Sequence, residues 1–195
     1  MDALDAIFAR RSTGRLTGPA PAGDDLARIL EAAAAAPDHG GLRPFRFVVL
    51  AGDAKDAFGQ VLADAYLARC EAVGATPTPG QLHKERTKLG RAPLVLVVGA
   101  VHCDDEVIPW VEQRAAADAA AENALIAATA LGYGSMWRTG DPVYDQRVKD
   151  ALGFGPHDAV VGFLYLGTRH EGEPPPAARQ PDLDGLVTWW KPPPA

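Results

Sequence analysis

The sequence has only two cysteines among its 195 residues, Cys70 and Cys103, and they lie far apart. They form no metal-spaced pair, and this usage favours a reducing compartment. The longest strongly apolar run, Leu94 to Val101, is far too short to span a bilayer. Acidic residues outnumber basic ones, 25 to 19, so no basic surface indicates nucleic acid. The amino-terminal stretch has acids before its apolar residues, unlike a secretory signal. We therefore expect a cytoplasmic protein without nucleic-acid or membrane partners.

Several catalytic signatures are also missing. There is no G-x-S-x-G elbow, and neither cysteine lies in a nucleophile signature. Gly132-x-Gly134 ends a helix, whereas a dinucleotide fingerprint follows a strand and opens a helix. The loop 102–106 (HCDDE) offers metal-type ligands, but five consecutive side chains cannot all converge on one ion. We expect a solvated loop there and no metal site.

The length suits one domain with a sizeable core. Helices and short strands alternate along residues 1–168, but several connections are not compact βαβ units. This pattern favours an α+β fold in which helices cover a sheet. The proline-rich stretch 169–195 cannot build a core of its own, and we treat it as a carboxy-terminal extension of the 1–168 domain.

Alternating patterns and turn residues predict the elements of the domain. We expect helices near 3–10, 24–36, 54–73, 110–131 and 142–152, and strands at 45–50, 94–101, 134–139 and 159–166. The alanine-rich helix from Trp110 is apolar most of the way round, which is typical of a buried helix. Gly132 suits its left-handed C-cap. Asp141 and Pro142 suit the N-cap and first position of the last helix.

Basic, hydroxyl and aromatic residues gather at the ends of these elements. They are Arg10, Arg11 and Ser12; His39 and Arg43; and Trp137, Arg138 and Thr139. Each has an ordinary structural explanation, such as a solvated helix end for the first two arginines or a core position for Trp137. Together they suit a phosphorylated planar cofactor. Arginines and a serine hydroxyl can bind the phosphate, and an aromatic side chain can pack against the flat ring of the cofactor.

Four stretches carry a resemblance to a known family. They are ARRSTGR near the start, APDHGGLRPFRFVVL after the second helix, GYGSMWRTG after the long helix, and VVGFLYLGT in the last strand. In this order and spacing they resemble the nitroreductase family, and more narrowly its small bacterial members. The resemblance implies an α+β homodimer with a mainly antiparallel sheet. It implies FMN between the subunits, hydride uptake from NADH or NADPH, and ping-pong reduction of nitroaromatics or quinones.

The resemblance also implies site residues. It places FMN contacts at Arg10, Arg11 and Ser12, at His39, and at Trp137, Arg138 and Thr139. It places the nicotinamide cofactor at the end of the long helix, at Ala127, Ala128, Thr129, Ala130, Leu131 and Gly132. Flavin carries the redox chemistry itself, so no catalytic residue is assigned.

This chain departs from the family pattern at several positions. Arg43 and Phe45 flank a proline where many members have glutamine and tryptophan. Ala35 stands where small members can carry arginine, and Gly14 stands where the wider family often has a basic residue. The sequence therefore leaves open which group stabilises reduced flavin, and it specifies neither the acceptor nor the choice between NADH and NADPH.

Other functions stay open beside the reductase. One is a flavin-binding dimer with a storage or sensing role, and another is a related reductase acting in dehalogenation or flavin breakdown. In the tail, GLVTWW (Gly185 to Trp190) has strong β character, with Pro174 to Pro176 as a stiff spacer before it. In the resembled family the carboxy-terminal segment embraces the partner subunit. We expect Leu186 to Trp190 to pair with the other protomer.

Overall fold

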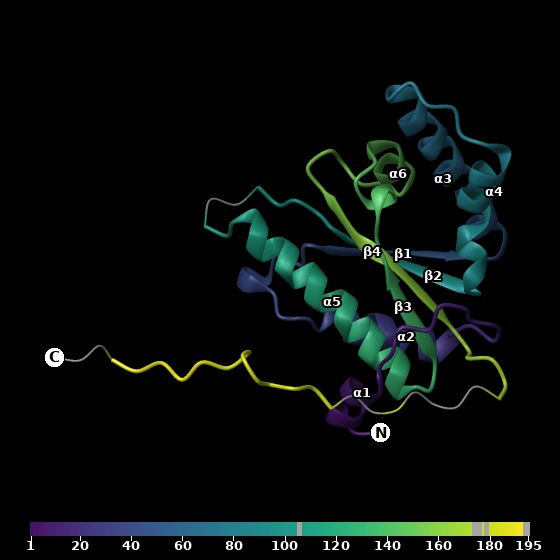
Figure 1. Cartoon of the computed structure of the whole chain (residues 1–195). Helices are drawn as coiled ribbons and strands as arrows, with labels where there is room; N and C mark the ends of the chain where they lie inside the picture. Colours follow the sequence, from purple (N-terminus) through teal and green to yellow (C-terminus); the bar gives the residue numbers. More distant parts are fainter. Residues whose placement is uncertain (105–106, 173–176, 178–179, 193–195) are drawn as a thin grey trace.

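A computed structural model describes residues 1–104, 107–172, 177 and 180–192. Its centre is a four-stranded sheet in the order β1-β2-β4-β3, in which every pair of neighbours is antiparallel (Figure 1). The strands are β1 (Phe45–Ala51), β2 (Leu94–Ala100), β3 (Gly134–Arg138) and β4 (Ala159–Gly167). The expected α+β fold and antiparallel sheet are confirmed.

Helices cover both faces of this sheet. The α-helices are α1 (Ala3–Ala9), α2 (Gly23–Ala34), α3 (Gly52–Ala72), α4 (Pro79–Thr87), α5 (Trp110–Ala130) and α6 (Gln146–Ala151). Short 3-10 helices occur at η1 (His39–Gly41), η2 (Lys88–Arg91) and η3 (Asp141–Val143). One core cluster joins α2 and α5 to the sheet, and the other joins α3, η2 and α6 to its opposite face.

The strand β2 lies between the two clusters. All seven of its residues are buried, as the continuous branched run LVLVVGA predicts for a strand covered on both faces. Glycines let bulky rings lie flat on the sheet: a Cβ at Gly99 would overlap the Phe154 ring, and one at Gly162 would overlap the Trp137 indole. These close approaches hold the faces of β2 and β4 against their neighbours.

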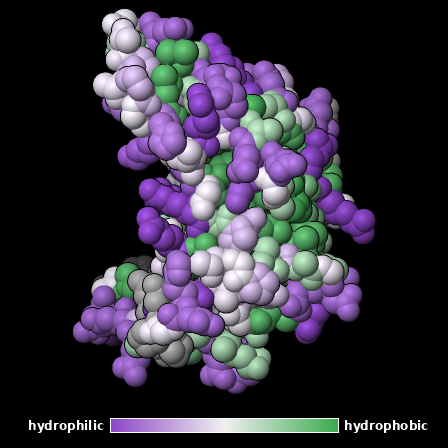
Figure 2. All heavy atoms as spheres, turned by 90° about the vertical axis from the view of Figure 1, so that its right-hand side faces the viewer, coloured by the Kyte–Doolittle hydropathy of each residue, from purple (hydrophilic) through white to green (hydrophobic). Residues whose placement is uncertain are grey.

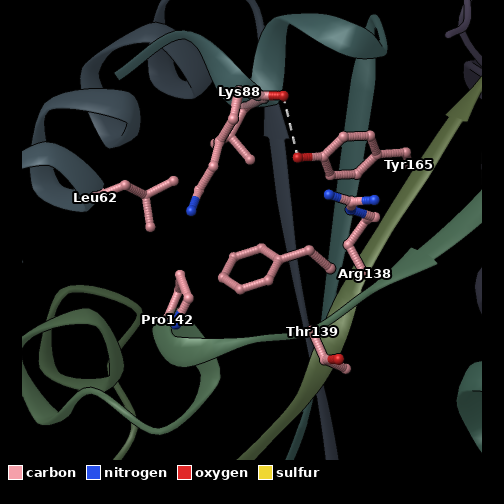
Figure 3. A pocket seen from close by; sticks show the side chains of 8 residues that line it. Leu62, Lys88, Arg138, Thr139, Pro142 and Tyr165 are labelled. Carbon is pink, nitrogen blue, oxygen red and sulfur yellow. Dashed lines mark hydrogen bonds between the residues drawn. The ribbon is translucent and has the colours of Figure 1, made fainter. Parts of the chain in front are cut away.

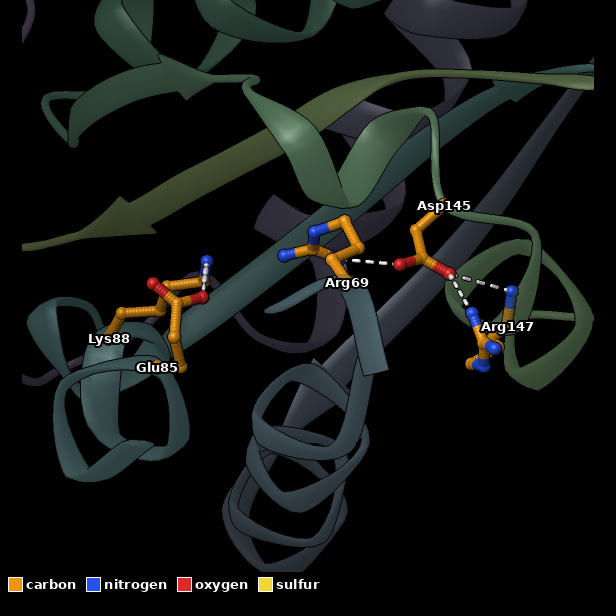
Figure 4. Close-up of polar contacts among 5 residues, drawn as sticks. All are labelled: Arg69, Glu85, Lys88, Asp145 and Arg147. Atoms are coloured by element: carbon orange, nitrogen blue, oxygen red, sulfur yellow. Dashed lines mark hydrogen bonds and ion pairs between the residues drawn. The ribbon is translucent and has the colours of Figure 1, made fainter. Parts of the chain in front are cut away.

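The prediction that the last helix begins at Pro142 is wrong, because α6 begins at Gln146. Asp141 to Val143 form only a 3-10 turn, and α6 begins after Asp145, whose carboxylate accepts a hydrogen bond from Arg147 N. Asp145 is also bound by the Arg69 guanidinium at 2.5 Å (Figure 4). The Arg69 contact from the end of α3 fixes Asp145 as the cap, a choice that local sequence could not make.

Apolar residues remain uncovered on α1 and in the tail. Only Ala6 of α1 is buried, and Leu4, Ile7 and Phe8 are 63%, 45% and 39% exposed. In the tail the exposed large residues are Leu183, Leu186, Val187, Trp189 and Trp190. Figure 2 shows apolar atoms also at the surface of the side that carries α3 and α4. Single chains rarely expose so many large apolar side chains together, so these surfaces suit contact with another molecule.

The long helix α5 is only partly a buried helix. Nine of its residues are buried, but Val111 is 70% exposed and Ala130 is also exposed. Gly132 ends it with φ +90°, as expected for the left-handed cap. No helix of the described residues combines the length and apolar character of a membrane span. The expected spacer 174–176 and part of the loop 102–106 lie outside the described residues. The division at residue 168 stays a prediction.

Candidate functional site

The predicted FMN segment 10–12 lies beside the edge strand β3, which leads into the predicted segment 137–139. Ser12 forms a parallel bridge with Ser135, and Thr13 N donates to the Ser135 carbonyl at 2.9 Å. Ser135 precedes Arg138 by three residues on the same strand. The hydroxyl of Ser135 is buried and has no hydrogen-bond partner among the described residues. The fold therefore brings Ser12 beside the strand that carries Trp137 and Arg138.

Arg10 and Arg11 point to different partners. The helix α1 ends at Ala9, so Arg10 is its C-cap, and its Nε lies 3.4 Å from Glu122 Oε1 on α5. Arg11 instead donates to backbone carbonyls of Phe8, Arg10 and Ala177. The two side chains therefore make different contacts. Glu122 holds the Arg10 guanidinium against α5.

Trp137 and Arg138 lie on opposite faces of β3, as neighbours on a strand must. Trp137 is half-buried on the face that α5 covers, where its Nε1 donates to the Val161 carbonyl at 3.2 Å. Arg138 and Thr139 are exposed and line a hollow on the other face. Trp137 thus has the core role that its residue type favours, whereas the Arg138 side chain is exposed at the hollow.

The hollow beside Arg138 has a volume of about 40 Å³ (Figure 3). Its lining residues come from α3, η2, β3, η3 and β4, and they are Leu62, Lys88, Leu89, Arg138, Thr139, Pro142, Phe163 and Tyr165. The Tyr165 hydroxyl donates to the Lys88 carbonyl at 3.2 Å. Burial raises the pKa of Tyr165, while the charges of Arg138 and Arg91 act to lower it. The site therefore carries positive charge over an apolar floor.

His39 lies elsewhere on this chain. Its Nδ1 is 2.6 Å from the Glu112 carboxylate at the start of α5. The loop that carries it bends through Gly40 and Gly41, both with φ +70°, and a Cβ at Gly40 would overlap Ile108. Glu112 and Glu122, the partner of Arg10, are ten residues apart on one helix, or about 15 Å along its axis. Within one chain, His39 is not brought beside Arg10.

The predicted nicotinamide segment ends α5. Ala128 and Thr129 are buried toward the sheet, and the Thr129 hydroxyl donates to the Leu125 carbonyl. Ala127 and Ala130 instead line an open groove of about 440 Å³ between α1, α2 and α5. Ala35, which stands where small members of the resembled family can carry arginine, lines the same groove. The outer residues of this segment can be approached, while the inner two serve the core.

Sequence reasoning missed several residues of this region. Lys88, Phe163 and Tyr165 line the hollow, and Glu112 and Glu122 pair with the predicted site residues. Phe163 and Tyr165 lie in the stretch VVGFLYLGT, but nothing in it marks them as lining a hollow, and the contacts of Glu112 and Glu122 are with residues distant in sequence. In the part of the chain that the structure describes, no three His, Cys, Asp or Glu side chains are placed to hold a metal ion.

Comparison with known proteins places this arrangement in a family. The model of the nitroreductase family matches residues 7–168. The chain is 38% identical over 168 residues to "Putative NAD(P)H nitroreductase YdjA" of Escherichia coli K12, covering 86% of this chain and 88% of that protein. A relative from Haemophilus influenzae, named "Putative NAD(P)H nitroreductase", is 33% identical over 172 residues, which cover 88% of this chain and 90% of that protein. 

Solved structures share the fold. A nitroreductase-like protein from Bacillus cereus superposes with a TM-score of 0.76 at 20% identity, covering 98% of this chain and 97% of that one. A nitroreductase with bound FMN from Bacteroides fragilis gives 0.70 at 22% identity, covering 98% and 100%. The family match extends over nearly the whole folded region and over the segments that meet at β3. The chain therefore belongs to the nitroreductase family.

Proposed function

We propose that this protein is an FMN-dependent oxidoreductase. It takes a hydride from NADH or NADPH and reduces nitroaromatic or quinone-type acceptors in a ping-pong cycle. Family membership supports the reaction class, and the relatives named as NAD(P)H nitroreductases support the hydride donor. The observation that carries the proposal is the pairing of Ser12 with Ser135, because it brings together two segments far apart in sequence that are both predicted to bind the cofactor.

The side chains present fit FMN. Arg10, Arg11 and the Ser12 hydroxyl are donors of the kind that binds a phosphate, and they follow directly after α1 ends at Ala9. Arg138 and Thr139 line the hollow, and we propose that one edge of the flavin lies there. FMN supplies the hydride chemistry, and the protein binds, orients and excludes water. We assign no catalytic residue, since no side chain has to transfer a proton for hydride to reach the flavin.

The proposed site needs two chains. His39 lies about 15 Å along α5 from the region of Arg10, so a second copy can bring its own His39 to the cofactor. The uncovered Leu4, Ile7 and Phe8 of α1 give a second copy an apolar surface next to Arg10. We propose an obligate homodimer with FMN between the subunits.

The tail is the second element of this proposal. Leu186 to Trp190 forms no strand with its own chain, and Trp189 and Trp190 are 86% and 80% exposed. A segment of this kind can add to the sheet edge of another chain. Removal of residues 180–195 should lower dimer stability and loosen FMN together. A shortened protein that stays dimeric at nanomolar concentration, with unaltered FMN affinity, would show that the tail is not needed for the interface.

The test of the cofactor is a titration. The purified protein should carry a flavin absorption spectrum or take up one FMN per subunit. A colourless protein that leaves added FMN free in solution would remove the proposed function. Steady-state NAD(P)H oxidation with a nitroaromatic or quinone then separates a reductase from a flavin-binding dimer that stores or senses, because only the reductase turns over.

A further inference from the structure

The hollow at the end of β3 carries more positive than negative charge. Lys88 and Arg138 line it, and Arg91 acts on its Tyr165 from outside the lining. Glu85 is the acid whose charge also reaches this tyrosine. The whole chain has a net charge of −6, so the positive charge of this hollow is opposite in sign to the net charge of the protein.

Two cations of this region, Arg91 and Arg138, have no acidic partner among the described residues, and of the two only Arg138 lines the hollow. Lys88 forms an ion pair with Glu85, and Arg10 forms one with Glu122 (Figure 4 shows the first). For Arg138, no carboxylate of the described residues lies within ion-pair distance. Figure 3 shows its guanidinium directed along the Tyr165 ring, at the wall of the hollow. Its charge is therefore uncompensated where a ligand would enter.

Apolar residues lie beside that charge. Leu62, Leu89 and Phe163 form walls of the hollow, and Arg138 lies exposed at its edge. Burial raises the pKa of the Tyr165 hydroxyl, and the charge of Arg138 acts in the opposite direction. Arg138 thus favours negative charge in this hollow.

We propose that Arg138 favours the reduced over the oxidised state of bound FMN. The inference rests on the proposed function. A hydride brings two electrons and one proton, so FMN gains one negative charge when it is reduced. The hollow of about 40 Å³ is too small to enclose a separate aromatic acceptor. With one edge of the flavin at the hollow, the charge of Arg138 would raise the reduction potential of the cofactor.

The test compares Arg138→Met with Arg138→Lys in the FMN-loaded dimer. The methionine variant should bind reduced FMN about 10- to 100-fold more weakly relative to oxidised FMN. For a two-electron couple this ratio lowers the midpoint potential by about 30–60 mV, measured against a reference dye. The lysine variant, which keeps the charge, should restore part of the potential.

The matched control is Arg91→Met. The charge of Arg91 acts on the same tyrosine, but Arg91 does not line the hollow. This variant should leave the potential within about 10 mV, roughly a twofold change in the ratio. An unchanged potential in Arg138→Met, or equal weakening of both FMN states, would overturn the proposal.

Two further outcomes separate this proposal from others. A higher KM in Arg138→Met for carboxylate-bearing acceptors alone, at unchanged potential, would make Arg138 an acceptor contact and refute the role proposed. Failure of the unmodified protein to bind FMN would refute the proposed function itself. Thermal unfolding of each variant checks that the fold is retained, and Arg138→Gln, which also removes the charge, replaces the methionine variant if that one unfolds.

Discussion

Replacement of Arg10 by methionine tests whether the end of α1 holds the cofactor phosphate. Methionine keeps the length of the side chain and removes its charge. The Arg10 side chain is 21% exposed, and its partner Glu122 is 46% exposed. An ion pair this open contributes about 0–1 kcal/mol, so the folded protein should lose little stability. A charge-assisted contact with phosphate is worth about 1.5–3 kcal/mol, so FMN should bind roughly 10- to 100-fold more weakly.

Flavin fluorescence quenching gives the dissociation constant for this comparison. Arg11→Met is the matched control, because its donors already go to backbone carbonyls, and it should lose less affinity. Glu122→Gln removes a carboxylate that competes with phosphate for Arg10, so it should leave FMN affinity unchanged or increase it. Equal affinity in Arg10→Met and the unmodified protein would show that this arginine is only a capped helix end paired with Glu122.

Three further substitutions test the frame around the site. Gly162→Ala places a methyl group into the tryptophan indole above it and should cost about 1–3 kcal/mol in denaturant unfolding, whereas Gly155→Ala, which meets only ordinary contacts, should cost less. Asp145→Asn breaks the ion pair with Arg69. The Arg69 side chain is 26% exposed, so the loss should be about 1–3 kcal/mol, below that of a fully buried pair. Burial raises the pKa of Tyr165 above its ordinary 10.0, so its stabilisation is complete below pH 10 and is lost as pH rises through the folded pKa. Tyr165→Phe should flatten that alkaline decline in thermal stability, and an equally steep decline would contradict the assignment.

Local patterns were sufficient for most elements of the fold. The run at β2 predicted a strand buried on both faces, and Gly132 predicted the end of α5, because each depends on residues close in sequence. The start of α6 could not be predicted in this way. Asp141 and Asp145 are both acceptable caps, and Arg69 from α3 selects the second. Tertiary contacts decide between local signals of similar strength.

The same distinction applies to the site. The resemblance predicted that Arg10 to Ser12 and Trp137 to Thr139 belong together, and the bridge between Ser12 and Ser135 brings these stretches side by side. It did not predict which face of β3 each side chain takes. Strand alternation sends Trp137 to the core under α5 and Arg138 to the hollow. The ligand contacts themselves stay predictions.

The apolar residues of α1 show why burial is hard to infer from one chain. A pattern such as Leu4, Ile7 and Phe8 indicates a face that is covered, but not by what. In the single chain that face is open, and Arg10 follows it directly. A second chain that covers it would also exclude water around Arg10 and strengthen its contact with a phosphate. Because linkage is reciprocal, a cofactor held by Arg10 would stabilise the dimer by the same free energy that the dimer adds to its binding. Dimer formation and cofactor binding at the end of α1 are therefore one coupled equilibrium under the proposed function.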